Sequence, residues 1–124
     1  MITLDATSKS LEVDLAGAVN STELDWSVDY AVFEGIQLAD FANQAGVTSG
    51  ATAVTMVTAP VGVQRKLIKT ITVTNTDDAV ATVTVQLNDG TVRLLYKAAA
   101  VPVGGGVRYA NGIWKTHAAS GAEL

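Results

Sequence analysis

The chain has 124 residues and a formal net charge of −4; 48% of its residues are apolar and only 16% are charged. This length suits one domain, and this apolar fraction suits a folded chain rather than a disordered one. No apolar run approaches the roughly 18 residues of a membrane helix. We therefore expect no membrane-spanning protein. Because the net charge is weakly acidic, we also expect no binding to nucleic-acid phosphates.

The residue types favour β-structure and exclude thiol chemistry. Valine and threonine together make up more than a quarter of the chain, and β-branched side chains pack well on a pleated sheet. The chain has no cysteine and a single histidine, which excludes disulfides, thiolate metal sites and cysteine nucleophiles. The N-terminus has neither a basic region nor a long apolar stretch, so we expect no secretory signal and production in a cytoplasm.

Two strands are predicted near the N-terminus. Apolar and acidic residues alternate over residues 10–15, which indicates a half-buried strand. A longer alternation runs over residues 24–32, with Trp26 and Tyr30 on its apolar face. The closeness of these two acidic strands suggests a hairpin with a wet outer face, although like charges directly opposite each other would destabilise it.

The segment over residues 33–52 follows no clear period. Its large apolar residues are Phe33, Ile36, Leu38 and Phe41. They fit neither strand nor helix spacing, and a glycine interrupts them. We therefore predict a long loop or extended arm at about residues 33–52, with a short helix as the less favoured alternative. A loop this long in a small domain often reaches a partner.

From residue 53 onward, short strands alternate with turns. The predicted strands cover residues 53–57, 67–75, 81–87, 92–96, 107–109 and 113–114. Asn88-Asp89-Gly90 is a hairpin signal, and Asn111-Gly112 is typical of a type I′ turn. Ile68 falls on the wrong face of its strand, which predicts either a bulge there or partial burial of both strand faces. The residues that we expect to be buried together are Leu67, Ile71, Val73, Ala81, Val83, Val85 and Leu87.

The elements add up to an all-β fold. About seven to nine short antiparallel strands, spaced by turns, are typical of a β-sandwich or a jelly-roll-like barrel. Neither half of the chain can bury a core alone. We therefore predict a single domain over residues 1–124.

Candidate chemical sites are weak. Asp25 and Asp29 share a strand face, but such a pair stands about 13 Å apart, whereas catalytic carboxylate pairs need about 5 to 9.5 Å. The glycine run 104–106 lacks the Lys-Ser/Thr of a phosphate loop. His117 has no second imidazole, and Asp77-Asp78 lacks the spacing of a calcium loop. We predict no catalytic residue, no cofactor and no metal site, and hence no enzyme.

The aromatic residues and one basic cluster are two further candidates for a binding site. Trp26 and Tyr30 are expected in the core because they share an apolar strand face. Tyr109 and Trp114 could instead stack on sugar rings. Gln64-Arg65-Lys66 is the only local basic cluster, and we expect it to be a solvated strand edge.

Four stretches carry a resemblance to a known family: Thr55–Pro60, Val63–Asn75, Val83–Leu87 and Tyr109–Trp114. Their Thr/Val alternation, Ala-Pro, Ile-Thr-Val-Thr-Asn and Asn-Gly-x-Trp signatures resemble small virion structural proteins of tailed bacteriophages, over about half of the chain. The chain departs from that pattern in two places. Three glycines at 104–106 stand where such proteins often have Gly-Glu, and residues 33–43 are unusual.

The resemblance implies a non-enzymatic structural protein of the virion, assembled in the cytoplasm of the host bacterium. The favoured role is a capsid decoration or cement protein that contacts the major capsid protein and itself, as a trimer or dimer, with no nucleic acid and no membrane as partner. A neck or tail component, such as a fibre-attachment adaptor, is the first alternative. A carbohydrate-binding β-sandwich is the second.

The candidate partner contacts follow from the irregular segment. An apolar segment that does not pack in its own domain is best explained by packing on another chain. We therefore expect Phe33, Ile36, Leu38 and Phe41 to form the contact surface.

Overall fold

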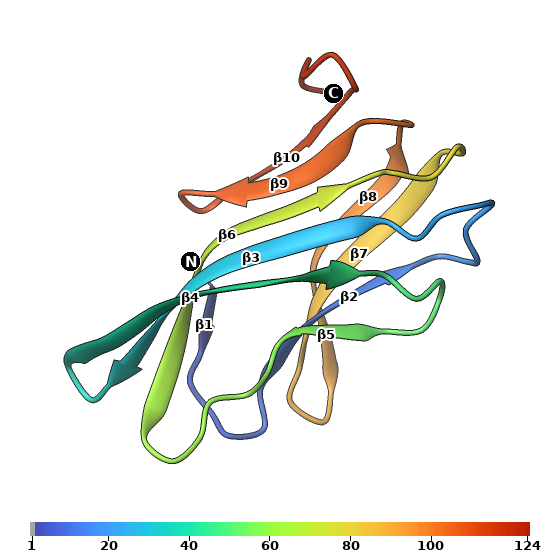
Figure 1. Cartoon of the computed structure of the whole chain (residues 1–124). Coiled ribbons are helices and arrows are strands. Elements are labelled where there is room, and N and C mark those ends of the chain that lie inside the picture. The colour runs from blue at the N-terminus through green and yellow to red at the C-terminus, as the bar shows by residue number, and fades with distance from the viewer. Residues whose placement is uncertain (1) are drawn as a thin grey trace.

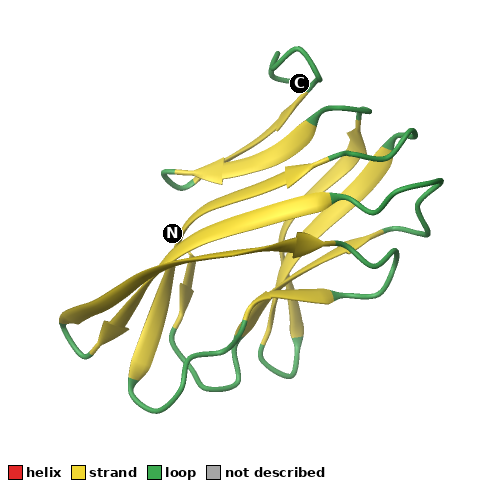
Figure 2. Cartoon of the chain, viewed as in Figure 1, coloured by secondary structure: helices red, strands yellow, loops and turns green. Residues whose placement is uncertain are grey.

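The computed structural model describes residues 2–124, which form ten strands and no helix (Figures 1 and 2). The strands are β1 (Ile2–Leu4), β2 (Ser10–Leu15), β3 (Asp25–Glu34), β4 (Gln37–Val47), β5 (Val54–Val57), β6 (Gln64–Thr74), β7 (Ala81–Asn88), β8 (Val92–Val101), β9 (Gly106–Ala110) and β10 (Ile113–His117). In this part of the chain no helix is long and apolar enough to cross a membrane.

The strands form two antiparallel sheets that face each other as a sandwich (Figure 1). The six-stranded sheet has the order β10-β9-β6-β3-β4, with β1 beside β6, and the four-stranded sheet has the order β5-β2-β7-β8. This arrangement confirms the all-β prediction in its sandwich form, since the sheets do not close into a barrel. The strand order places β4 near β5 on one side and β10 near β8 on the other.

The core lies between the sheets, where the alternating residues predicted from the sequence meet. Ile71, Val73, Val83 and Val85 have no exposed surface, as the strand pattern requires. Leu67, Ala81 and Leu87 are only partly buried, which corrects the expectation for these three.

A bulge in β6 explains the position of Leu67. Asp29 of β3 pairs with Thr70, but the next residue, Tyr30, pairs with Ile68, so Lys69 is the extra residue. The extra residue reverses the side-chain alternation. The bulge predicted at Ile68 is therefore confirmed. It buries Ile68 and turns Leu67 to the outer face of the sheet.

Two sequence predictions about the N-terminal half are wrong. The predicted hairpin between residues 10–15 and 24–32 does not form, because β2 pairs with β5 and β7 whereas β3 pairs with β4 and β6. This separation keeps the two acidic strands from facing each other in one sheet. The predicted loop at 33–52 is instead mostly the end of β3 and all of β4.

β4 was missed because it is exposed on both faces. Almost all of its residues are exposed, so no apolar-polar alternation marks it. A bulge at Ala39 breaks the period further, because Val32 pairs with Asp40 whereas Phe33 pairs with Leu38. An edge strand with this pattern carries the sequence signature of a loop.

Candidate interaction surface

A tight turn joins β3 to β4 and stands at one extremity of the molecule (Figure 1). Glu34 pairs with Gln37, which leaves Gly35 and Ile36 as the two turn residues. Gly35 has a φ of 64°, and a type II′ hairpin turn places glycine at this position because other residues are strained there. The turn presents Ile36 with its side chain fully exposed.

The predicted contact residues meet at this end of the hairpin. Phe33 pairs with Leu38, and Phe41 pairs with Ala31, two residues before Phe33. Alternate residues of a strand share a face, so these side chains lie together on the outer face of the six-stranded sheet. The exposed fractions are 62% for Phe41 and 47% for Leu38, while Phe33 is half-buried. We call Phe33, Ile36, Leu38 and Phe41 the hairpin surface.

Polar groups of β6 surround and fix the hairpin surface. Arg65 Nη2 donates to the Gly35 carbonyl oxygen at 3.1 Å, which ties the turn to β6. The Lys69 ammonium lies 5.1 Å from the centroid of the Phe41 ring, within the range of a cation–π contact. A shallow depression of about 200 Å³ lies beside Phe33 and is also lined by Thr3, Arg65 and Leu67. An apolar centre bordered by polar side chains is the pattern that protein contacts share.

Sequence reasoning missed Leu67 and Lys69 as members of this outer face. The signal was present in Ile68, because a bulge after Ile68 necessarily turns Leu67 outward. The spacing of apolar residues along the sequence could not predict the cross-strand pairing that places Lys69 beside Phe41.

Lys66 corrects the expectation of a solvated basic cluster. Its side chain is buried at one end of the sandwich, and its ammonium donates to the Thr58 carbonyl at 2.9 Å and to Thr58 Oγ1 at 3.1 Å. The ammonium also lies 5.5 Å from the centroid of the Tyr30 ring. Burial lowers the pKa of Lys66. Only Arg65 and Gln64 of the predicted cluster reach the surface, and both hydrogen-bond the β3–β4 hairpin.

The Asp29 carboxylate stabilises the six-stranded sheet. Its carboxylate accepts hydrogen bonds from Asn43 Nδ2 at 2.7 Å and from Thr70 Oγ1 at 2.8 Å, and these bonds lower the pKa of Asp29. The three residues tie β4, β3 and β6 together on the outer face. A carboxylate held ionised by two donors is a poor proton carrier at neutral pH.

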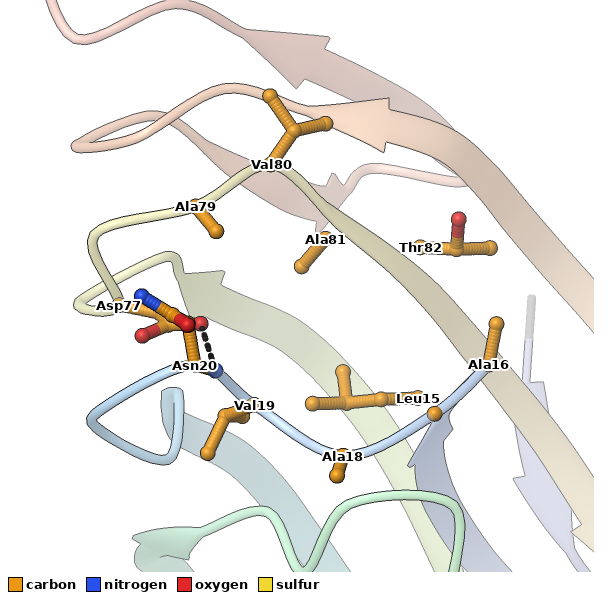
Figure 3. Close-up of a pocket in the computed structure, with 11 residues that line it drawn as sticks. Leu15, Ala16, Ala18, Val19, Asn20, Asp77, Ala79, Val80, Ala81 and Thr82 are labelled. Atoms are coloured by element: carbon orange, nitrogen blue, oxygen red, sulfur yellow. Dashed lines mark hydrogen bonds between the residues drawn. The ribbon is translucent and has the colours of Figure 1, made fainter.

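The hollow beside Asp77 is structural as well. Leu15–Asn20 and Ala79–Thr82 line a pocket of about 320 Å³ (Figure 3). The Asp77 carboxylate accepts hydrogen bonds from the N–H groups of Asn20, Ser21 and Thr22. These bonds, led by that of Asn20, hold the pKa of Asp77 well below its ordinary value of 3.8. The carboxylate therefore locks the β2–β3 connection and is not free to act as a base.

Tyr109 and Trp114 do not form an open platform on which a sugar ring could stack. Tyr109 is buried, with 3% of its surface exposed. Trp114 stacks in parallel on Tyr96 of the opposite sheet, with a centroid separation of 4.9 Å, and contacts Tyr109 at 4.8 Å. Trp26 and Tyr30 lie in the core, as predicted. These aromatic rings hold the two sheets together.

The glycine run is a tightly packed turn. A Cβ on Gly105 would collide with the His117 carbonyl, and a Cβ on Gly106 would collide with the Val73 carbonyl. Glycine is therefore required by close backbone packing. His117 itself lies beside the Ala118 carbonyl, with Nδ1 at 3.2 Å.

Within residues 2–124 no group of three or more His, Cys, Asp or Glu side chains is placed to hold a metal ion. No protein-family model, curated protein or solved structure matches the chain.

Proposed function

We propose that this protein is a non-enzymatic structural component of a tailed-phage virion, most specifically a cement or decoration protein that binds the major capsid protein on the shell. The observation that supports this function is the hairpin surface. It presents a fully exposed Ile36 on a turn that Arg65 of β6 holds in place and a largely exposed Phe41 on the following strand, β4. The resemblance of four sequence stretches to phage virion proteins supplies the setting.

The proposed binding works by burial of preorganised anchors. Large side chains that are exposed in the free protein gain free energy when a partner covers them, at about 25 cal/mol per Å² of apolar surface. The Arg65 bond to the turn limits the entropy that is lost on binding, because the hairpin is already ordered. A few such anchors within a polar rim carry most of the energy of a protein contact.

A neck or tail adaptor remains the alternative within the virion, since the same surface would serve there. In both functions the hairpin surface binds another virion protein. The two functions differ in where the protein sits in the virion and in its number of copies per particle. In either case we place the protein in the virion, after assembly in the cytoplasm of the host bacterium.

The substitution Phe41→Ala tests the proposed contact. We expect it to weaken binding to purified shells by about 2 kcal/mol, close to a 30-fold rise in Kd. The Phe41 ring is 62% exposed and lies outside the core, so the melting temperature of the isolated protein should stay nearly unchanged. Co-sedimentation with shells and a thermal melt measure the two quantities.

Leu94→Ala is the matched control. Leu94 is also 62% exposed, but it lies on β8 of the other sheet, so its removal should leave binding unchanged. If Phe41→Ala instead lowers the melting temperature by several degrees and binds shells normally once folded, Phe41 serves stability and the proposed contact is wrong.

A further inference from the structure

β4 forms a long sheet edge without a partner. It is the last strand of the six-stranded sheet, and its side away from β3 presents unpaired N–H and C=O groups at alternate residues. β4 has eleven residues and carries a single charged side chain, Asp40. A long edge with so little charge is a template for pairing with another strand.

The other edges of the described sandwich are protected. The C-terminal tail covers β10. The Leu124 N–H donates to the Thr116 carbonyl at 2.8 Å, and Glu123 forms an isolated antiparallel β-bridge with His117. β1 and β5 have only three and four residues. β8 carries two exposed cations, Arg93 and Lys97, and two register shifts in its pairing with β7. Charges, bulges and short strands are the usual defences of an edge, and β4 lacks them after its bulge at Ala39.

The regular part of β4, residues 41–47, is uncharged and held rigid. Gly46 packs against the ring of Trp26, so that a Cβ there would lie 2.7 Å from Cζ2. Asn43 bonds Asp29. At the end of the strand Thr48 N–H donates to the Leu24 carbonyl at 2.9 Å, and its hydroxyl accepts from the Leu24 N–H. Because this edge strand is already ordered, little conformational entropy is lost when it pairs with another strand.

We infer that residues 41–47 of β4 pair antiparallel with the same residues of a second copy of this chain, with the two-fold axis at Gln44. The pairing joins the two six-stranded sheets edge to edge along about 24 Å, for seven residues at about 3.4 Å each. The interface is isologous, which is the commonest arrangement for a dimer of identical chains.

The side chains favour a second copy in this register. On the outer face Phe41 meets the partner's Val47, and these two residues are 62% and 52% exposed in the single chain. On the other face Ala42 meets the partner's Gly46, and the two Gln44 amides meet on the axis, where one donates and the other accepts. Asp40 lies outside the paired stretch, so no like charges oppose each other.

Charge at position 44 tests this pairing. Because Gln44 meets itself across the axis, Gln44→Lys and Gln44→Glu should each place like charges together and raise the dimer Kd severalfold. An equimolar mixture of the two variants should form a heterodimer that restores association. Gln37→Lys and Gln37→Glu are the matched controls, since Gln37 is an exposed glutamine of the same strand outside residues 41–47.

Sedimentation equilibrium and native mass spectrometry of the isolated protein read the result. The wild-type chain should form a dimer of twice 12.8 kDa at micromolar to submillimolar concentrations. A monomer throughout that range, or a dimer that ignores both position-44 charges, overturns the inference. Circular dichroism checks that each variant folds.

A cysteine at position 44 gives a second measurement if a charged variant fails to fold. The chain has no cysteine, so under mild oxidation Gln44→Cys should cross-link to itself whereas Gln37→Cys should not. Equal cross-linking of the two variants contradicts the register. The inference goes beyond the proposed function and is tested without shells, so its failure leaves the particle contact of the hairpin surface untouched. Because Phe41 belongs to both surfaces, the position-44 variants, which keep Phe41, separate the loss of the dimer from the loss of shell binding.

Discussion

At the scale of single residues, Asp77 shows how one carboxylate replaces regular structure. The β2–β3 connection has no strand partner along Asn20–Thr22, yet its three N–H groups all donate to Asp77. Asn75 extends the same network, since its Nδ2 donates to the carbonyls of Ala79 and Val101. Residues 75–78 lie in the connection between β6 and β7, and the reach of Asp77 to residues 55 to 57 positions earlier depends on the fold.

We predict that Asp77→Asn lowers the melting temperature by several degrees at pH 7, because the amide is a weaker acceptor for three N–H donors. The pKa of Asp77 is lower in the folded protein than in the unfolded one. Its stabilising contribution is therefore complete above the unfolded value of about 4 and is lost as the pH falls toward the folded pKa.

Thermal melts between about pH 7 and pH 2 check the pH dependence. The gap between the wild-type and Asp77→Asn melting temperatures should shrink as the pH falls. Asp78→Asn is the control, because Asp78 accepts only the side-chain amide of Asn20, at 2.7 Å. A gap that stays constant with pH would show that Asp77 does not act through its charge.

At the scale of elements, sequence patterns predicted strands well where one face is buried. β2 and β6 alternate because one face of each packs on the core, so their existence could be predicted from period alone. β4 could not be predicted in this way, since its pairing with β3 holds it in place while both of its faces remain exposed. The same lack of a regular period made Phe33, Ile36, Leu38 and Phe41 stand out as contact candidates.

The core face of β6 gives a direct test of the packing. Val73 has no exposed surface and pairs with Trp26 on one side and Val107 on the other. We predict that Val73→Asp destabilises the protein by more than about 4 kcal/mol, because it buries an unpaired charge in an apolar layer. Urea unfolding, or the loss of soluble protein, measures this effect.

Thr72→Asp is the control for Val73→Asp. Thr72 is the neighbouring residue, it points to the other face of β6, and it pairs with Arg108 of β9, so its change should cost less than about 1 kcal/mol. Similar free energies of unfolding for the two variants would contradict the assignment of the two faces.

At the scale of the whole molecule, the sandwich has a closed side and an open side. The stack of Tyr96 on Trp114 and the C-terminal tail close the side of β8 and β10. The side of β4 presents the unpaired edge, and the β3–β4 turn presents the hairpin surface. A small domain that presents a fully exposed Ile36 and a largely exposed Phe41 on one hairpin is suited to hold other chains in position, which is the role that we propose.

The composition of the purified virion tests that role most directly. A stained gel of particles from the phage that carries this chain should show a 12.8 kDa band with hundreds of copies per particle, as a cement protein on the shell requires. Tens of copies or fewer would instead assign the protein to the neck or tail. Particles that contain none of this chain would contradict the proposal that it is a structural part of the virion.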